Sequence, residues 1–193
     1  MPTSEQAFGE ERRANGEPRL SCYTRAMRVL GIDCGGECTG YGVVEQNGSG
    51  PLHHLCSGAI RLASREPLEL RLKKISEGLA EIILAYSPEE VAIEDVFYAV
   101  NVKSALKLGH VRGVAMLAAA QAGLPVIAYS PLSIKSAVVG YGKAEKSQVQ
   151  IMVARLLELP APPESPDAAD ALAIAICHLH TSTTLRRQQA GAS

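Results

Sequence analysis

Two carboxylates of this chain end short apolar segments. Asp33 follows Val-Leu-Gly-Ile and precedes Gly35-Gly36, and Glu94 follows Val-Ala-Ile. Short apolar runs bounded by turn residues are typical of buried strands. Where two such strands run parallel, their last residues are neighbours at the carboxyl edge of the sheet, which is where open α/β sheets place ligand sites. Asp33 also fits a simpler role, because Asp beside Gly commonly forms a turn.

Asp167 and Asp170 lie three residues apart near the start of a predicted helix. Ser165 is a suitable N-cap, Pro166 suits the first helical position, and the segment that follows is apolar on almost every side. This spacing places both carboxylates on one face of the helix. A first-turn Asp also favours the helix dipole, which accounts for Asp167 alone but not for Asp170, deeper among alanines and leucines.

Four carboxylates on three buried elements repel one another unless cations neutralise them. Carboxylate oxygens are the ligands that Mg²⁺ and Mn²⁺ prefer. Two such ions can stabilise both the attacking water and the leaving oxygen when a phosphodiester is hydrolysed. The acidic set therefore predicts a metal-dependent phosphodiesterase site made of Asp33, Glu94, Asp167 and Asp170.

Hydrophobic periodicity predicts a single α/β domain over residues 27–181 that positions these side chains. We expect three consecutive strands, then helices alternating with two further strands. The first three strands should form an antiparallel meander, and the last two should run parallel to the first, giving a mixed five-stranded sheet with helices on both faces. The first expected strand begins at Met27, and the other four cover 39–44, 53–62, 91–94 and 125–129. The expected helices cover 67–86, 101–121, 131–139, 145–157 and 166–180.

The two ends of the chain differ from this domain in composition. Residues 1–26 are polar and lack periodicity, which predicts a disordered extension, and Met27 is a candidate for the true start. Residues 182–193 are polar and predict a flexible tail.

Charge and cysteine usage narrow the functional classes. The net charge of −1 gives no global signal for nucleic acid, so any such contact would need a local basic patch. No apolar run is long enough to span a bilayer. Five irregularly spaced cysteines without a secretory signal indicate reduced thiols in a cytoplasmic protein. A zinc site remains an alternative for four of the side chains, namely Cys34, Cys38, His53 and His54.

Several segments together resemble one known family. They are Gly-Ile-Asp-Cys-Gly at Asp33, Thr-Gly-Tyr-Gly-Val-Val, Ala-Ile-Glu-Asp-Val-Phe at Glu94, Ser-Ala-Leu-Lys-Leu-Gly, Ala-Glu-Lys-Ser-Gln-Val-Gln and Asp-Ala-Ala-Asp-Ala-Leu-Ala-Ile-Ala-Ile. In order and spacing they are similar to RuvC, the bacterial Holliday-junction resolvases, over Met27 to about His180. The chain departs from the family at Cys34, commonly Pro, and at Asp95, often Gln. Neither change removes a carboxylate of the set, and Asp95 should point away from Glu94 on a strand.

The resemblance implies a ribonuclease-H-like fold and a homodimer that nicks a four-way DNA junction at two symmetric positions. It implies Mg²⁺ or Mn²⁺ as cofactor, two ions per subunit, with Asp33 bridging them and Glu94, Asp167 and Asp170 completing the ligand set. It also implies RuvA and RuvB, the branch-migration proteins, as partners.

Basic and aromatic side chains are candidates for DNA contacts. Lys103, Lys107 and His110 form one polar stripe on the second expected helix, although scattered lysines more often mark a solvated face. The resemblance implies phosphate contacts at Lys135 and Lys146 and an aromatic near the junction centre at Phe97. The DNA-binding candidates are Phe97, Tyr98, Lys103, Lys107, Lys135, Lys143 and Lys146.

Three other functions fit parts of this sequence. An actin- or hexokinase-like ATPase has a similar phosphate loop around Asp33, but it requires a second domain for which the chain is too short. A junction-binding protein without cleavage would lack the acidic set, which is present. A nuclease of the same fold that acts on structured RNA is the remaining alternative.

Overall fold

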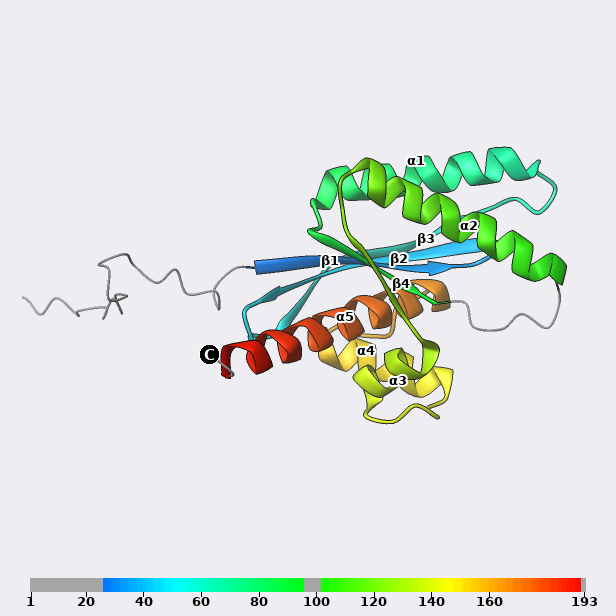
Figure 1. Ribbon diagram of the computed structural model, residues 1–193. Helices are drawn as coiled ribbons and strands as arrows, with labels where there is room; N and C mark the ends of the chain where they lie inside the picture. The colour runs from blue at the N-terminus through cyan, green and yellow to red at the C-terminus, as the bar shows by residue number, and fades with distance from the viewer. Residues whose placement is uncertain (1–25, 96–101, 192–193) are drawn as a thin grey trace, which may run out of the picture.

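The computed structural model describes residues 26–95 and 102–191. Within this part the chain forms one five-stranded sheet with the strand order β3-β2-β1-β4-β5. The sheet lies between two layers of helices (Figure 1). The strands are β1 (Ala26–Cys34), β2 (Cys38–Asn47), β3 (Leu52–Arg61), β4 (Glu90–Glu94) and β5 (Val126–Tyr129).

The pairing of the strands confirms the predicted mixed sheet. β1 pairs antiparallel with β2, and β2 pairs antiparallel with β3, so these strands form a meander. β4 lies parallel to β1 on its other side, and β5 lies parallel to β4. β1 is therefore central, which agrees with its run of apolar residues buried on both faces.

The helices begin and end within one or two residues of the predicted positions, with one exception. α1 and α2 cover one face of the sheet, and α3, α4 and α5 cover the other (Figure 1). Ser130 caps α3 through its side chain, and Glu145 and Gln148 form a reciprocal capping box at the start of α4. The helices are α1 (Leu68–Tyr86), α2 (Val102–Gln121), α3 (Pro131–Val139), α4 (Lys146–Leu156) and α5 (Pro166–Gly191).

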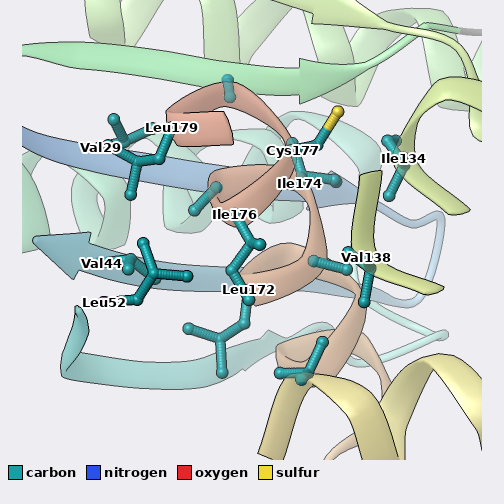
Figure 2. Close-up of a cluster of buried hydrophobic side chains, with 14 of the residues drawn as sticks. Val29, Val44, Leu52, Ile134, Val138, Leu172, Ile174, Ile176, Cys177 and Leu179 are labelled. Carbon is teal, nitrogen blue, oxygen red and sulfur yellow. The ribbon is translucent and has the colours of Figure 1, made fainter. Parts of the chain in front are cut away.

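Two apolar clusters, one on each face of the sheet, hold the layers together. Figure 2 shows the cluster under α5, where Leu172 and Ile176 of the helix meet Val29 of β1 and Val44 of β2. The other cluster joins β1 and β4 to α1 and α2. The all-round apolar character predicted for the first half of α5 is confirmed, since nearly every residue from 168 to 179 is buried.

The predicted end of α5 at about His180 is wrong, because the helix continues to Gly191. The segment after His180 contains no Pro or Gly before Gly191, so it has no helix-breaking residue. Its threonine hydroxyls also bond back onto the helix: Thr181 donates to the carbonyl of Cys177 and Thr184 to that of His180, both at 2.8 Å.

The N-terminal extension predicted for residues 1–26 lies outside the described residues except for Ala26, which begins β1 rather than ending a tail. In the described part of the chain, no helix is both long and apolar enough to cross a membrane.

Candidate active site

The first pair of carboxylates meets at the edge of the sheet. Ile32 of β1 pairs with Ile93 of β4 in the parallel register, so Asp33 and Glu94 come next on neighbouring strands. Beside them, the buried Arg71 of α1 donates a hydrogen bond to the carbonyl of Gly36 and so holds the turn after β1. The predicted juxtaposition of Asp33 and Glu94 is confirmed.

Glycines in the sheet let α5 pack closely enough to bring Asp167 and Asp170 to the site. A Cβ at Gly40 of β2 would overlap the carbonyl oxygen of Asp167, and a Cβ at Gly31 of β1 would overlap that of Ala171. The helix backbone therefore rests directly on the strand backbone. Because Asp167 and Asp170 lie in the first part of α5, this close approach brings them to the edge where Asp33 ends β1.

The electrostatic behaviour of Asp33 shows that the four carboxylates form one group. Burial raises the pKa of Asp33 to about 7, and the charges of Asp170, Glu94 and Asp167 add to this effect in that order. The pKa of Glu94 is also raised, first by burial and then by Asp170. Repulsion of this kind is what the sequence predicts for carboxylates that share one site.

Two lysines from α3 and α4 supply opposing charge. The Lys146 ammonium lies 2.5 Å from Asp170 Oδ2, and this contact raises the pKa of the lysine. Lys135 donates a 2.8 Å hydrogen bond to the carbonyl of Ala144, just before α4, and its charge lowers the pKa of Glu94. The structure thus places Lys135 and Lys146, two of the predicted phosphate-contacting residues, close to the carboxylates.

The four carboxylates suit a hard divalent cation in their charge and in their oxygen atoms, but they lie too far apart in this structure to hold one. Among residues 26–95 and 102–191, no three His, Cys, Asp or Glu side chains approach closely enough to hold an ion as they stand. Like charges repel one another, and the charges of Asp170, Glu94 and Asp167 contribute, after burial, to the raised pKa of Asp33. A cation would favour a closer approach, because it removes the cause of the separation.

Two other predicted DNA-contacting residues, Lys107 and Lys143, lie on the surface. Lys107 is exposed on α2, across the sheet from Lys146, and Lys143 is exposed in the loop before α4. Phe97 and Tyr98 lie outside the described residues, as does the side chain of Lys103, and no contact is assigned to them.

Asp95 turns away from the acidic set, as predicted. Its Oδ1 lies 3.4 Å from Arg112 of α2, on the face of the sheet opposite α5. The pairing of Cys34 with Thr39 across the hairpin puts Cys34 and Cys38 on opposite faces of the sheet. The described residues therefore give no support to the zinc alternative.

Sequence reasoning missed a thiol that contacts the site. Cys38 of β2 hydrogen-bonds the carboxylate of Asp167, and burial together with this bond raises the pKa of the thiol to about 11. The contact depends on the seating of α5 over Gly40, two residues further along β2. The position of Cys38 in the sequence gives no sign of its contact with Asp167.

The raised pKa of Asp33 predicts how stability depends on pH when no divalent cation is added. Between the ordinary value of 3.8 and about 7, the folded protein keeps a proton that the unfolded chain has released. Stability therefore falls as pH rises through this window, by about 2–4 kcal/mol. Urea unfolding in EDTA at pH 5 and pH 8 measures the change, and Asp33→Asn should remove most of it. Parallel pH profiles for both proteins would contradict the assignment.

Comparison with known proteins agrees with this geometry. Residues 29–178 match the family model described as crossover junction endodeoxyribonuclease RuvC. The chain belongs to the RuvC family. The RuvC of Koribacter versatilis is 66% identical over 166 residues, which is 86% of this chain and 100% of that protein. The RuvC of Shewanella woodyi is 57% identical over 157 residues, covering 81% of this chain and 89% of that protein.

Solved structures of Holliday junction resolvases are also similar to this chain. The structure of T. thermophilus RuvC in complex with a Holliday junction substrate matches with a TM-score of 0.78 at 35% identity, covering 82% of this chain and 96% of that one. The yeast mitochondrial Holliday junction resolvase Ydc2 matches with a TM-score of 0.62 at 18% identity, over 86% and 83% of the two chains, which supports the fold alone.

Proposed function

We propose that this protein is a structure-specific DNA endonuclease that resolves Holliday junctions by paired symmetric nicks, in recombination and DNA repair. The observation that carries this is the convergence of Asp33, Glu94, Asp167 and Asp170 at one sheet edge, beside two lysines, in the fold of a RuvC solved with a Holliday junction. The alternative, a nuclease for structured RNA, is not favoured, because the relatives are endodeoxyribonucleases.

The chemistry of the site fits hydrolysis of a phosphodiester. The four carboxylates would hold Mg²⁺ or Mn²⁺, two ions per subunit, and such ions activate water and neutralise charge on a phosphoryl group. Lys146 and Lys135 place positive charge where the phosphate would approach, which favours binding of the anionic backbone. Asp33 accepts or releases a proton near neutral pH, so its charge responds to the arrival of a cation.

A homodimer would place one site on each of two opposing strands of a junction with approximate two-fold symmetry. α2 carries exposed apolar side chains that suit such a contact, including Val102, Leu106 and Leu117 at 74%, 61% and 53% exposure. RuvA and RuvB are the proposed functional partners. The cytoplasm, where thiols stay reduced, is the proposed location.

A nicking assay tests the function directly. Synthetic four-way junctions and linear duplexes of the same sequence would be incubated with Mg²⁺, Mn²⁺ or EDTA. We expect paired nicks in the junction with either ion, little cutting of the duplex and none in EDTA. Equal cutting of junction and duplex would end the resolvase proposal.

Lys146→Ala should weaken junction binding in a salt-dependent way. Each phosphate contact that is lost reduces the slope of log affinity against log salt by about 0.9, so the variant should lose most affinity at low salt and approach wild type as salt rises. Binding is measured in EDTA to prevent cleavage. Lys73→Ala, which removes an exposed lysine paired with Glu77 on α1, is the matched control. An unchanged slope for Lys146→Ala would argue against a phosphate contact.

A further inference from the structure

Arg71 of α1 is a buried cation that the proposed cleavage chemistry does not use. It is 8% exposed, and its guanidinium donates a hydrogen bond to the carbonyl of Gly36 in the turn after β1. The ion pairs formed within residues 26–95 and 102–191 do not include Arg71, and its Nε has no hydrogen-bond partner there. Burying a cation without a negative partner is costly, so an anion that reaches this side chain would be strongly stabilised.

Holding the turn does not by itself explain the charge of Arg71. One carbonyl needs one donor, whereas a guanidinium has five N–H donors. A neutral donor at this position could bind the Gly36 carbonyl without the cost of burying a charge. The guanidinium therefore suits a partner with several acceptor oxygens, and phosphate oxygens match its geometry well.

Arg71 lines a small pocket together with Lys107 of α2. The space of about 10 Å³ admits roughly one water-sized atom, so it can take one oxygen of a phosphate but not a whole nucleotide. The other lining residues are Gly36 and five apolar side chains, and no acidic side chain of the described residues is among them. Two positive charges in apolar surroundings attract an anion more strongly than they would in water.

The place of Lys107 on α2 directs it to this pocket. It lies one helical turn before Val111, which is buried against the sheet and also lines the pocket. Lys107 itself is exposed, unlike Arg71. It can therefore attract an anion from solvent, and Arg71 can then bind it.

The pocket lies close to the acidic site but on the other face of the sheet. Gly36 belongs to the turn that follows Asp33 at the end of β1. α1 and α2 cover the face opposite α5, the helix that carries Asp167 and Asp170 (Figure 1). A DNA molecule bound across this edge can therefore place one phosphate at the carboxylates and another at Arg71.

We propose that Arg71 and Lys107 form a second phosphate site, which binds a backbone phosphate of the junction other than the one that is cut. The proposal rests on the proposed junction-cleaving function and adds a positioning contact to it. Only one oxygen is enclosed, so a free phosphate ion would bind weakly, whereas the rest of the DNA interface would keep a backbone phosphate in place. Because Arg71 also bonds the turn after Asp33, this contact would fix the DNA relative to the carboxylates.

Neutralising single phosphates of the junction tests this proposal. Junctions carrying one uncharged methylphosphonate linkage, placed at each position around the cut in turn, would be titrated in EDTA with wild type, Arg71→Met and Lys107→Met. Lys74→Met removes an exposed lysine from the same helix as Arg71 and is the matched control.

For wild type and Lys74→Met, a neutral linkage at one position other than the scissile phosphate should lower affinity by about tenfold or more, because hydrogen bonds to charged groups are worth that much. Arg71→Met should bind the unmodified junction more weakly by a similar factor. It should not respond to the neutral linkage at that position, although it should still respond at the others. If Arg71→Met and wild type respond by the same factor at every position, no phosphate binds Arg71.

Lys107→Met keeps the proposal testable if Arg71→Met does not fold. Lys107 is exposed, and its removal leaves the hydrogen bond between Arg71 and Gly36 in place. Lys107→Met should lose part of the response at the same linkage, with a smaller loss of affinity for the unmodified junction. A full wild-type response at that linkage would contradict a shared site.

Inorganic phosphate distinguishes a DNA phosphate from a free anion. If added phosphate raises the unfolding temperature of wild type but not of Lys107→Met, and no linkage distinguishes the two proteins, the pocket holds a free anion only and the proposal is overturned. Failure of the junction-cleaving function would look different, since junctions would then be bound and cut no better than duplexes.

Discussion

Asp33→Asn is expected to reduce junction cleavage by about 10³-fold or more, because a metal contribution of several kcal/mol to the transition state is lost with a ligand. Junction binding in EDTA should stay within about twofold of wild type, since Lys135 and Lys146 remain in place. Single-turnover nicking with Mg²⁺ and a binding titration in EDTA measure the two effects separately.

The structure provides a control for this variant and a check that the variant folds. Asp95→Asn makes the same chemical change at the same sheet edge, but on the face paired with Arg112, so it should cleave nearly as fast as wild type. Asp33→Asn should also be more stable than wild type at pH 8 without divalent cation, because it removes repulsion from Asp170, Glu94 and Asp167. Loss of cleavage with a gain in stability excludes unfolding as the cause. Wild-type nicking by Asp33→Asn would refute the role of this carboxylate.

Gly31→Ala is expected to destabilise the fold by about 3 kcal/mol, since its Cβ would overlap the carbonyl oxygen of Ala171 and approach the amide nitrogen of Ala175 to 2.8 Å. Both obstructing atoms belong to the α5 backbone, so no side-chain rotation can relieve the overlap. Urea unfolding at pH 5 gives the change in free energy. The cleavage rate should fall as well, because α5 carries Asp167 and Asp170.

Gly36→Ala is the matched control for this prediction. It lies in the turn after β1, and a Cβ there meets no atom within 4 Å. Its stability should remain within about 0.5 kcal/mol of wild type. Equal stability of Gly31→Ala and Gly36→Ala would show that α5 does not rest on the strand backbone.

The order of elements and the acidic set could be predicted because local signals agreed with the global arrangement. Asp33 and Glu94 end apolar runs, and parallel pairing of those two strands sufficed to make them neighbours. The resemblance to RuvC indicated the same residues as the physical argument did. The end of α5 was mispredicted because a polar composition was taken for a tail, although no residue there breaks a helix.

Contacts between elements distant in sequence could not be predicted. The ion pair of Lys146 with Asp170 depends on how α4 packs against α5. The buried His178 of α5 is another example: it lies 2.6 Å from Glu90 of β4 and 2.9 Å from the hydroxyl of Tyr129. None of these residues differs in spacing or neighbours from ordinary helix and strand positions, so only three-dimensional packing reveals the contacts.

The length of α5 makes it useful for spectroscopy. Its far part is anchored by Thr183, which donates a 3.2 Å hydrogen bond to Gln46 of β2, so the helix follows the sheet rather than projecting freely. Thr184 is exposed, and the helical rise puts it roughly 26 Å along the axis from Asp167. An azide-bearing residue at this position could carry a fluorophore at a fixed distance from the cut. Energy transfer from dyes on the four DNA arms would then report how each arm is bent while the strands are being cut.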